Sequence, residues 1–444
     1  MRKQPDKKLL EAIDAHLKKG EQPQETVTWV RKYRLITPLF GGGVSPTECD
    51  PVTIIRGSEI RGQLRFWWRA TRGGRNEYNG ELSKMKEAEA KIWGKAAVKG
   101  DPAPTHEEIL QISVDVLEKG TTVGPKAPPE YVAFPLQQVP NARLPLNVVF
   151  QLTISFPEKW QDDVKAALWA WETFGGIGAR TRRGFGAIYC PDPFPGIKPL
   201  IKSKNELTIP EIKGWIEENL SAFMGAEAKF PENVPHLNRD LIALIPPPAL
   251  ENKENKRPPR PAIDRVWFEL VRRLKNFRQP MYKQDRWPDG ENARKIVSNS
   301  VPNEYTKFPK ANIGLPIVFQ DKDDDSITLK GAEEGKDRFA SPLILRPAYF
   351  LEQPVGIALL LEGTDIYTDQ TKKPRSGPLQ LTKGRETYPD KPSTLTHPKH
   401  TTLTKREAAR IAPLRGVNKD HLGKTEILDA LFSCYKNSHG GATK

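Results

Sequence analysis

Two stretches of the N-terminal half alternate between hydrophobic and polar residues, and a period of two is typical of a half-buried β-strand. They span 26–39 and 146–156, and the second reads LNVVFQLTISF. In three other stretches apolar residues recur at every third or fourth position, which predicts amphipathic helices over 58–71, 83–97 and 158–174. The N-terminal half is therefore expected to combine strands and helices in an α+β fold.

Shorter β-rich stretches complete this part of the chain at 109–117, 131–136 and 187–189. In chain order the elements run strand, helix, strand, strand, helix, strand. That order is the ferredoxin-like, or RRM-like, arrangement, with an inserted helix after the first one. We expect a first domain of this kind over 1–190, beginning with a short amphipathic helix at 9–17.

The chain changes character after residue 190, where prolines crowd together and apolar periodicity becomes intermittent. Residues 364–402 hold many Thr, Lys and Pro and are expected to form a long loop. The expected strands are 240–245, 315–319, 343–345 and 355–362, and the expected helices are 262–277, 407–412 and 422–435. The pattern predicts a second α+β domain over 191–444.

The 444 residues carry a formal net charge of +14, which favours a polyanionic partner such as nucleic acid. A charge that serves only solubility is the alternative. The three cysteines form no CxxC pair, and no signal-peptide pattern or stretch of 18 apolar residues occurs. We therefore expect a cytoplasmic protein without membrane association, metal or cofactor.

The most informative segment is RGSEIRGQLRFWWRATRGG, residues 56–74. On the predicted helix, one face carries Ile60, Leu64, Trp67 and Thr71 and can be buried. The window 55–75 contains six arginines and a single glutamate, and no acid stands four residues after an arginine to neutralise it. Guanidinium groups bind phosphate oxygens in pairs and stack on bases, whereas a merely solvated charged face is the alternative. The residues predicted to contact RNA are Arg56, Arg61, Arg65, Trp68, Arg69 and Arg72.

A second segment, GGIGARTRRGFG at 175–186, combines glycines with arginines. Glycine lets a backbone approach a phosphate closely and leaves N–H donors accessible, while arginine supplies charge. The segment lacks a GK[ST] ending, and it follows a helix and precedes a strand, so neither standard nucleotide-binding loop fits. A turn that needs glycine only for its conformation is the alternative. The candidate RNA contacts here are Gly176, Gly178, Arg180, Arg182 and Arg183.

These motifs resemble those of a known family. The first segment, preceded by ITPLFGGG at 36–43, closely resembles the opening signature of the first RAMP subunit of type III-B CRISPR (Cmr) effector complexes. The glycine segment is similar to the glycine-rich loop of the RAMP superfamily. In the second half, GLPIVFQ at 314–320 and RFASPLILRP at 338–347 are similar to the signatures of a C-terminal RAMP domain.

The resemblance implies two tandem ferredoxin-like (RRM-like) RAMP domains with insertions. It also implies a non-catalytic RNA-binding subunit that contacts the 3′ region of the guide (CRISPR) RNA and helps to capture target RNA beside other Cmr subunits, in antiviral defence. It adds Arg338 and Ser341 of the second domain to the RNA-binding candidates.

The sequence offers no convincing catalytic constellation. Seven histidines are scattered, and none lies in the two basic segments. The acidic run QDKDDDS at 320–326 fails as a calcium loop, because Ser326 and Ala332 stand where glycine and glutamate are needed. A metal-independent RAMP endoribonuclease that processes guide RNA remains the alternative, with Lys32 and Tyr33 as candidates that the sequence leaves open.

Overall fold

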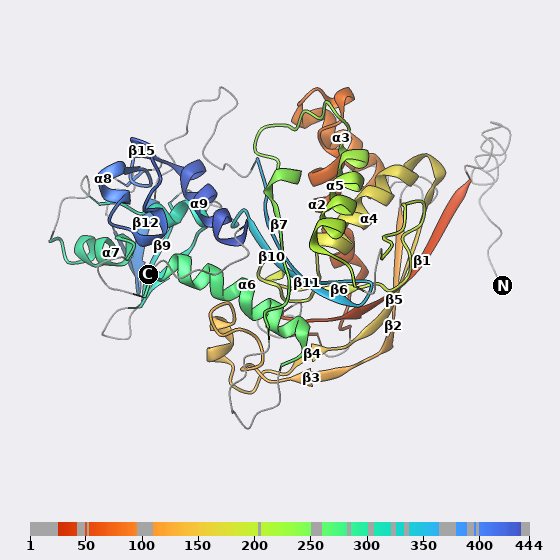
Figure 1. Ribbon diagram of the computed structural model, residues 1–444, viewed down its shortest axis with the longest axis horizontal. Coiled ribbons are helices and arrows are strands. Elements are labelled where there is room, and N and C mark those ends of the chain that lie inside the picture. The colour runs from red at the N-terminus through yellow and green to blue at the C-terminus, as the bar shows by residue number, and fades with distance from the viewer. Residues whose placement is uncertain are drawn as a thin grey trace, which may run out of the picture.

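The computed structural model describes residues 25–41, 49–50, 53–95, 110–202, 206–249, 260–281, 286–300, 306–320, 326–332, 337–363, 379–388, 395–396 and 399–436. The helix expected at 9–17 and the acidic residues 321–325 lie outside these ranges. Within them, the chain forms several antiparallel sheets together with helices, so the predicted α+β class is confirmed (Figure 1). None of the helices in this part of the chain is long and apolar enough to cross a membrane.

The first sheet has four strands in the spatial order β2-β5-β1-β6, and every pair is antiparallel. Its elements follow one another as β1 (Thr26–Leu35), α2 (Gly57–Arg72), α3 (Leu82–Trp93), β2 (Gln111–Glu118), β5 (Val149–Pro157), α4 (Gln161–Phe174) and β6 (Ile188–Tyr189). The alternation in β1 and β5 turns Tyr33 and Leu152 towards α2 and α4, whereas the paired Lys32 and Gln151 face the other side. A short hairpin, β3 (Thr121–Val123) with β4 (Leu144–Leu146), lies between β2 and β5 in the chain.

The second sheet has three strands, in the order β10-β11-β7, and is buried on both faces. Its elements are α5 (Ile209–Met224), β7 (Ile242–Ile245), α6 (Ala262–Arg278), β10 (Leu343–Phe350), β11 (Gln353–Leu360) and α9 (Lys424–Lys436). Ile344 and Ile357 belong to the core shared with the first sheet, whereas Leu345 and Ala358 pack in the core under α6 and α9. Burial on two faces explains why these strands are apolar almost throughout.

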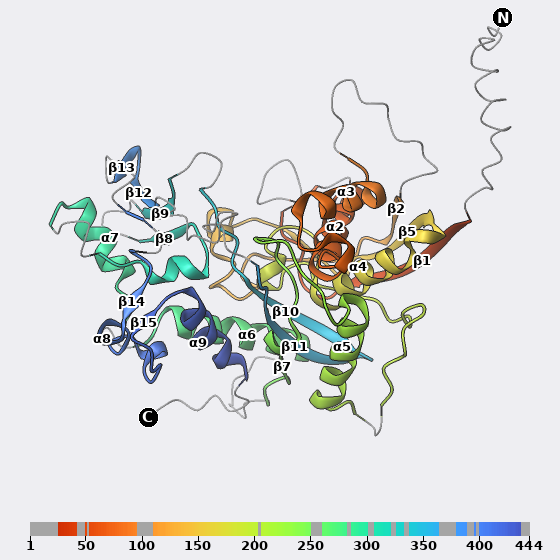
Figure 2. The ribbon, with the colours of Figure 1, turned by 90° about the horizontal axis from the view of Figure 1, so that it is seen from above.

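A separate small core lies under a third sheet, of order β13-β12-β9-β8. Its elements are α7 (Asp289–Val297), β8 (Ile317–Phe319), β9 (Ile327–Gly331), β12 (Leu379–Lys383) and β13 (Glu386–Tyr388). The third sheet and α7 are together called the insert below. In Figure 2 the insert lies on the side away from α2–α5, beside the group formed by β14 (Leu403–Thr404), α8 (Lys405–Ala408) and β15 (His421–Leu422). Since one core joins the first two sheets, the boundary at residue 190 stays a prediction.

Two expected elements were wrong. The strand expected at 131–136 is a turn followed by the 3-10 helix η2 (Phe134–Gln138), because Pro135 cannot donate a ladder hydrogen bond. The loop expected over 364–402 contains the hairpin β12–β13 within its described part. Helices α5 and α7 were not predicted.

Candidate nucleic-acid interface

The apolar face of α2 is buried as its spacing predicted, with Ile60 and Leu64 fully inaccessible. Its arginines meet an acid that does not lie on the same helix. Arg65 Nε is 2.7 Å and Arg69 Nη1 is 2.6 Å from Glu89 Oε1 on α3. These two side chains remain about a third exposed, at 34% and 31%, so they keep a surface for a phosphate while being partly neutralised.

Two of the residues predicted on α2 are withdrawn from the surface. Trp68 is fully buried, and its Nε1 donates to Asp163 Oδ1 of α4 at 2.7 Å. Arg72 is 15% exposed and donates from Nη1 to the main-chain oxygen of Phe223 at 2.9 Å. Trp68 was predicted to contact RNA, but its ring fills the space between α2 and α4 and is not accessible.

The two remaining α2 candidates lie nearer to the helix start. Arg61 donates from Nη1 to the oxygen of Trp93 at 3.0 Å and is partly exposed. Arg56 precedes the helix at its N-cap position, with its side chain partly exposed. Both can therefore reach solvent from the same end of the helix.

The glycines of the loop 175–186 are required by packing. A Cβ on Gly176 would lie 2.7 Å from the oxygen of Gly186. Gly178 has φ +82°, and a Cβ there would lie 2.5 Å from Leu39 Cδ1. The N–H of Gly178 donates to the carboxylate of Glu59, so the protein supplies its own anion where the sequence suggested a phosphate.

The loop's last two arginines join the first sheet to the second. Arg182 Nη1 donates to the oxygen of Ser341, and Arg183 Nη1 to that of Leu343 at 2.9 Å. Burial lowers the pKa of Arg183 to about 10, so its guanidinium stays charged at neutral pH. Ser341 is thus a packing contact of this loop, whereas Arg338 is exposed on the segment before β10.

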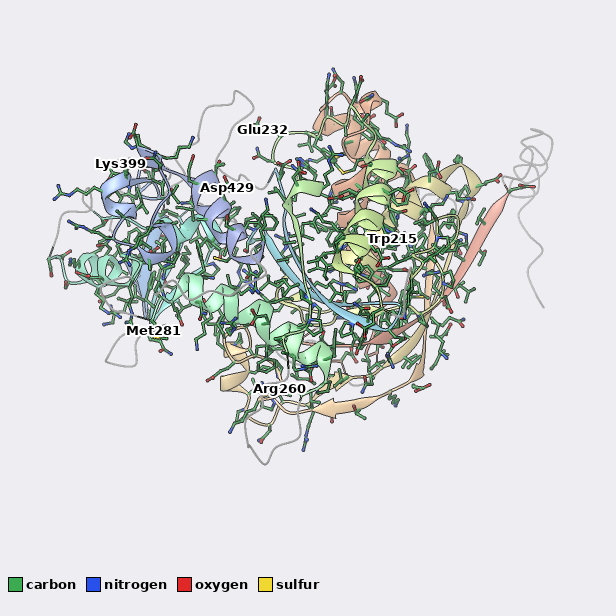
Figure 3. All side chains as sticks on the ribbon, in the orientation of Figure 1. Trp215, Glu232, Arg260, Met281, Lys399 and Asp429 are labelled. Carbon is green, nitrogen blue, oxygen red and sulfur yellow. The ribbon has the colours of Figure 1, made fainter. Side chains whose placement is uncertain are left out.

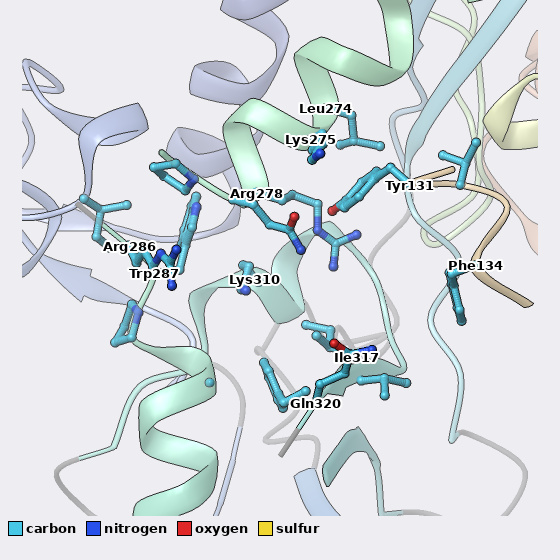
Figure 4. Close-up of a pocket in the computed structure, with 18 of the residues that line it drawn as sticks. Tyr131, Phe134, Leu274, Lys275, Arg278, Arg286, Trp287, Lys310, Ile317 and Gln320 are labelled. Carbon is cyan, nitrogen blue, oxygen red and sulfur yellow. The ribbon is translucent and has the colours of Figure 1, made fainter. Parts of the chain in front are cut away.

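A cleft of about 1590 Å³ opens between the glycine loop, the second half of α6 and the insert. Figure 4 shows Phe134 on one side of it and Trp287 on the other, with Arg278 and Lys310 between them. Of the residues predicted to bind RNA, only Arg180 and Arg183 line this cleft.

The cleft is strongly basic, because ten positively charged and three acidic side chains line it. Its cations come from segments that are far apart in the chain. The second half of α6 contributes Arg272, Lys275 and Arg278 along one wall. Cations from 286–310 and Arg410 continue the basic lining. A groove with this excess of positive charge suits a polyanion. It was not predicted because most of its cations come from segments that lie far apart in the chain.

Beneath the cleft lies a buried carboxyl group, Asp289, at the start of α7. Its Oδ1 accepts the main-chain N–H of Lys310 at 3.0 Å, and its Oδ2 has no partner in the described part of the chain. Burial raises the pKa of Asp289 to about 6, although the nearby charges of Lys310 and Arg278 oppose that rise.

Replacing Asp289 by asparagine should abolish one pH dependence of stability. Because its pKa is raised in the folded state, the wild-type carboxyl contributes stability that is complete below about pH 4 and lost as pH rises through 6. The free energy of unfolding of Asp289→Asn, relative to that of the wild type, should therefore be about 2–3 kcal/mol higher at pH 7.5 than at pH 4. Urea unfolding at both pH values measures this difference, with exposed Asp240→Asn as the control. The prediction is contradicted if the variant and the wild type differ in free energy of unfolding by the same amount at both pH values.

Lys32 and Tyr33, the candidates for the endoribonuclease alternative, lie on opposite faces of the first sheet. Tyr33 is 1% exposed, and its hydroxyl donates to Glu172 Oε1 at 2.6 Å inside the first core. Burial raises its pKa well above the usual value, so it is not a base at neutral pH. Lys32 is exposed on the open face of the first sheet.

Comparison with known proteins gives a family match for the first part of the chain. Residues 32–189 match the model of the RAMP superfamily, which covers the first sheet, α2, α4 and the glycine loop. The match agrees with the motifs at 56–74 and 175–186, which resemble those of RAMP proteins.

Solved structures give more distant likenesses. Cmr1 from Pyrococcus furiosus is 16% identical with a TM-score of 0.43, and the match covers 90% of this chain and 98% of that one. A chain of the type III-B Cmr-beta complex bound to cognate target RNA is 14% identical with a TM-score of 0.43, over 78% and 97% of the two chains. Cmr6 from Pyrococcus furiosus is 14% identical with a TM-score of 0.20, over 37% and 99%. No curated protein matches the chain.

Proposed function

We propose that this protein is an RNA-binding, non-catalytic subunit of a type III-B CRISPR (Cmr) effector complex. It contacts the 3′ region of the guide RNA and helps to capture target RNA, with other Cmr subunits as its neighbours. The observation that carries the RNA-binding role is the basic cleft, whose ten cations face only three acids. The RAMP domain and the Cmr-like signature at 36–74 support its place in such a complex.

We also propose two tandem ferredoxin-like domains, over 1–190 and 191–444. The first sheet has the order β2-β5-β1-β6, which is the order of a β-α-β-β-α-β unit. The second sheet repeats the first three positions of that order, with α6 and α9 as its helices. The sheet β8-β9-β12-β13 is then an insertion in the second domain.

Within this function, Arg180 supplies a direct RNA contact in the cleft, and Arg183 adds positive charge from beneath it. The partly exposed arginines of α2 form a second and weaker contact surface, made of Arg56, Arg61, Arg65 and Arg69. Arg338 is exposed beyond the cleft lining and can contact RNA leaving it.

The test is binding and cleavage of labelled single-stranded RNA on one set of gels, with and without EDTA. Retention without cleavage supports the binding role, and the logarithm of the affinity should fall with the logarithm of salt by about 0.7 per phosphate contact. The double variant Lys275→Glu/Arg286→Glu should bind roughly tenfold more weakly with a shallower salt slope, since two contacts are lost. Figure 4 shows both residues at the cleft.

Lys119→Glu is the matched control, because Lys119 is exposed beyond β2 and lies outside the cleft. Equal weakening by Lys119→Glu would mean that RNA binds through overall charge and would overturn the cleft as the site. Discrete cleavage by the wild type would instead support the endoribonuclease alternative.

A further inference from the structure

We infer that the cleft takes an unpaired RNA strand and that Phe134 stacks on one of its bases. This inference rests on the proposed RNA-binding function and names the form of RNA that the cleft recognises. It depends on apolar side chains that stand exposed among the cleft's cations.

Among the phenylalanine, tyrosine and tryptophan rings in the described part of the chain, only that of Phe134 is exposed, at 50%. The residues beside it are firmly anchored, since Val132 is 2% and Leu136 is 1% exposed. The ring is therefore held out by a packed segment at the start of η2. An exposed ring that is rigidly presented beside cations is the arrangement on which nucleic-acid bases stack.

The guanidinium of Arg180 packs over one face of the Phe134 ring. Its guanidinium carbon lies 4.6 Å from the centre of Phe134 and 5.9 Å from that of Phe40. Its Nη1 donates to the oxygen of Val132 at 3.1 Å, and its backbone takes the left-handed conformation with φ +60°. The cation thus stays beside the exposed ring, where it can meet the phosphate next to a stacked base.

Two further apolar side chains project into the cleft from other elements. Met281, just beyond α6, is 84% exposed, and Val318 of β8 is 48% exposed. Figure 3 shows Met281 at the edge of the molecule beyond the end of α6. A basic groove that binds only phosphates gains nothing from such groups, whereas unstacked bases cover them.

The exposed apolar side chains of Phe134, Met281 and Val318 favour an unpaired strand over a duplex. An A-form duplex keeps its base faces inside the stack and offers phosphates, 2′-hydroxyls and base edges to a protein. Pressed against Phe134 and Met281, it would bury apolar side chains against a polar surface. An unpaired strand offers base faces and phosphates together, which matches the exposed Phe134 ring and the cations of one groove.

The experiment measures affinity by fluorescence anisotropy for one RNA sequence, single-stranded and annealed to its complement. Phe134→Ala should weaken single-strand binding by about 5- to 150-fold, the usual range for one stacked base, and change duplex binding little. Phe134→Trp should retain the wild-type affinity. A 2-aminopurine base in the strand should change its emission on binding to the wild type and not to Phe134→Ala.

Val116→Ala is the control, because Val116 is an exposed apolar residue of β2 outside the cleft. Thermal melts check that the Phe134 variants fold, and Phe134→Leu serves if the alanine variant does not. The inference is overturned if Phe134→Ala binds the single strand like the wild type or weakens both forms equally, while Lys275→Glu/Arg286→Glu still weakens binding. A wild type that binds neither form overturns the proposed function as well.

Discussion

Arg346→Met should lower the free energy of unfolding by about 3–5 kcal/mol, as expected when a buried charge that satisfies several partners is removed. Arg346 lies in β10 and is 2% exposed. Its guanidinium donates to the main-chain oxygens of Glu172 (2.6 Å), Gly175 and Ile188 (2.7 Å). The first two oxygens lie at the end of α4, where carbonyls lack helical donors, so one side chain caps α4 and joins both sheets.

Removal of this side chain leaves three buried carbonyl groups without their donor. Burial lowers the pKa of Arg346 to about 9, yet the group remains charged at neutral pH and balances the carboxylate of Glu172. A lysine would keep the charge, but its three N–H donors leave one nitrogen and could not span the oxygens that Nη1 and Nη2 of Arg346 reach from separate positions. Arg346→Lys should therefore lose less stability than Arg346→Met and more than a surface substitution.

Urea unfolding of both variants measures this ranking, with Arg239→Met as the control, since Arg239 is exposed just before β7. An Arg346→Met midpoint equal to that of the wild type would show that the carbonyls of α4 find other donors. That result would contradict the role of Arg346 in joining the two sheets.

Local periodicity predicted the elements whose packing depends on a single face. The stripe Ile60, Leu64 and Trp67 is buried as expected, and the alternation of β5 places Phe150 and Leu152 in the core. These predictions succeed because a helix or a strand can bury only residues that recur with its own period. The glycine loop also lies before β6, where the RAMP resemblance put it.

Interactions between elements could not be predicted in this way. No acid on α2 stands three or four residues from Arg65 or Arg69, and Glu89 reaches these two arginines only because α3 folds back alongside α2. Trp68 was predicted to contact RNA, but it is buried between α2 and α4, where Asp163 of α4 accepts its N–H. A period along one helix carries no information about a partner on another.

The cleft could not be predicted for a related reason. Arg180 was a predicted contact, whereas Lys275 and Lys310 come from two other elements that the fold brings beside it, and neither stands out in its own segment. A signal was nevertheless present in 262–278, where arginine and lysine recur on the polar side of α6. That pattern resembles the arginine stripe of α2, and the structure shows that the α6 stripe is the one that lines an open groove.

Trp67→Ala should cost about 3–5 kcal/mol of stability, as expected for truncating a large side chain in a close-packed core. Trp67 is 2% exposed on α2, and its ring centre lies 5.9 Å from that of Phe174 on α4. The site is tight, because a Cβ placed on Gly175 would come within 2.6 Å of the Trp67 Nε1 atom. Urea unfolding measures the loss, with Val116→Ala as an exposed control.

A comparison of Trp67 with the neighbouring Trp68 separates the effect of packing on stability from that of hydrogen bonding. Trp67 Nε1 has no partner in the described part of the chain, whereas Trp68 Nε1 donates to the buried carboxylate of Asp163 at 2.7 Å. Both phenylalanine variants keep most of the ring volume, but only Trp68→Phe removes a donor from a charged group, which adds about 1.5–3 kcal/mol. Trp67→Phe should therefore be the milder change by that amount. Equal losses would mean that ring volume alone sets the stability of the contact between α2 and α4, and that the bond to Asp163 adds nothing to it.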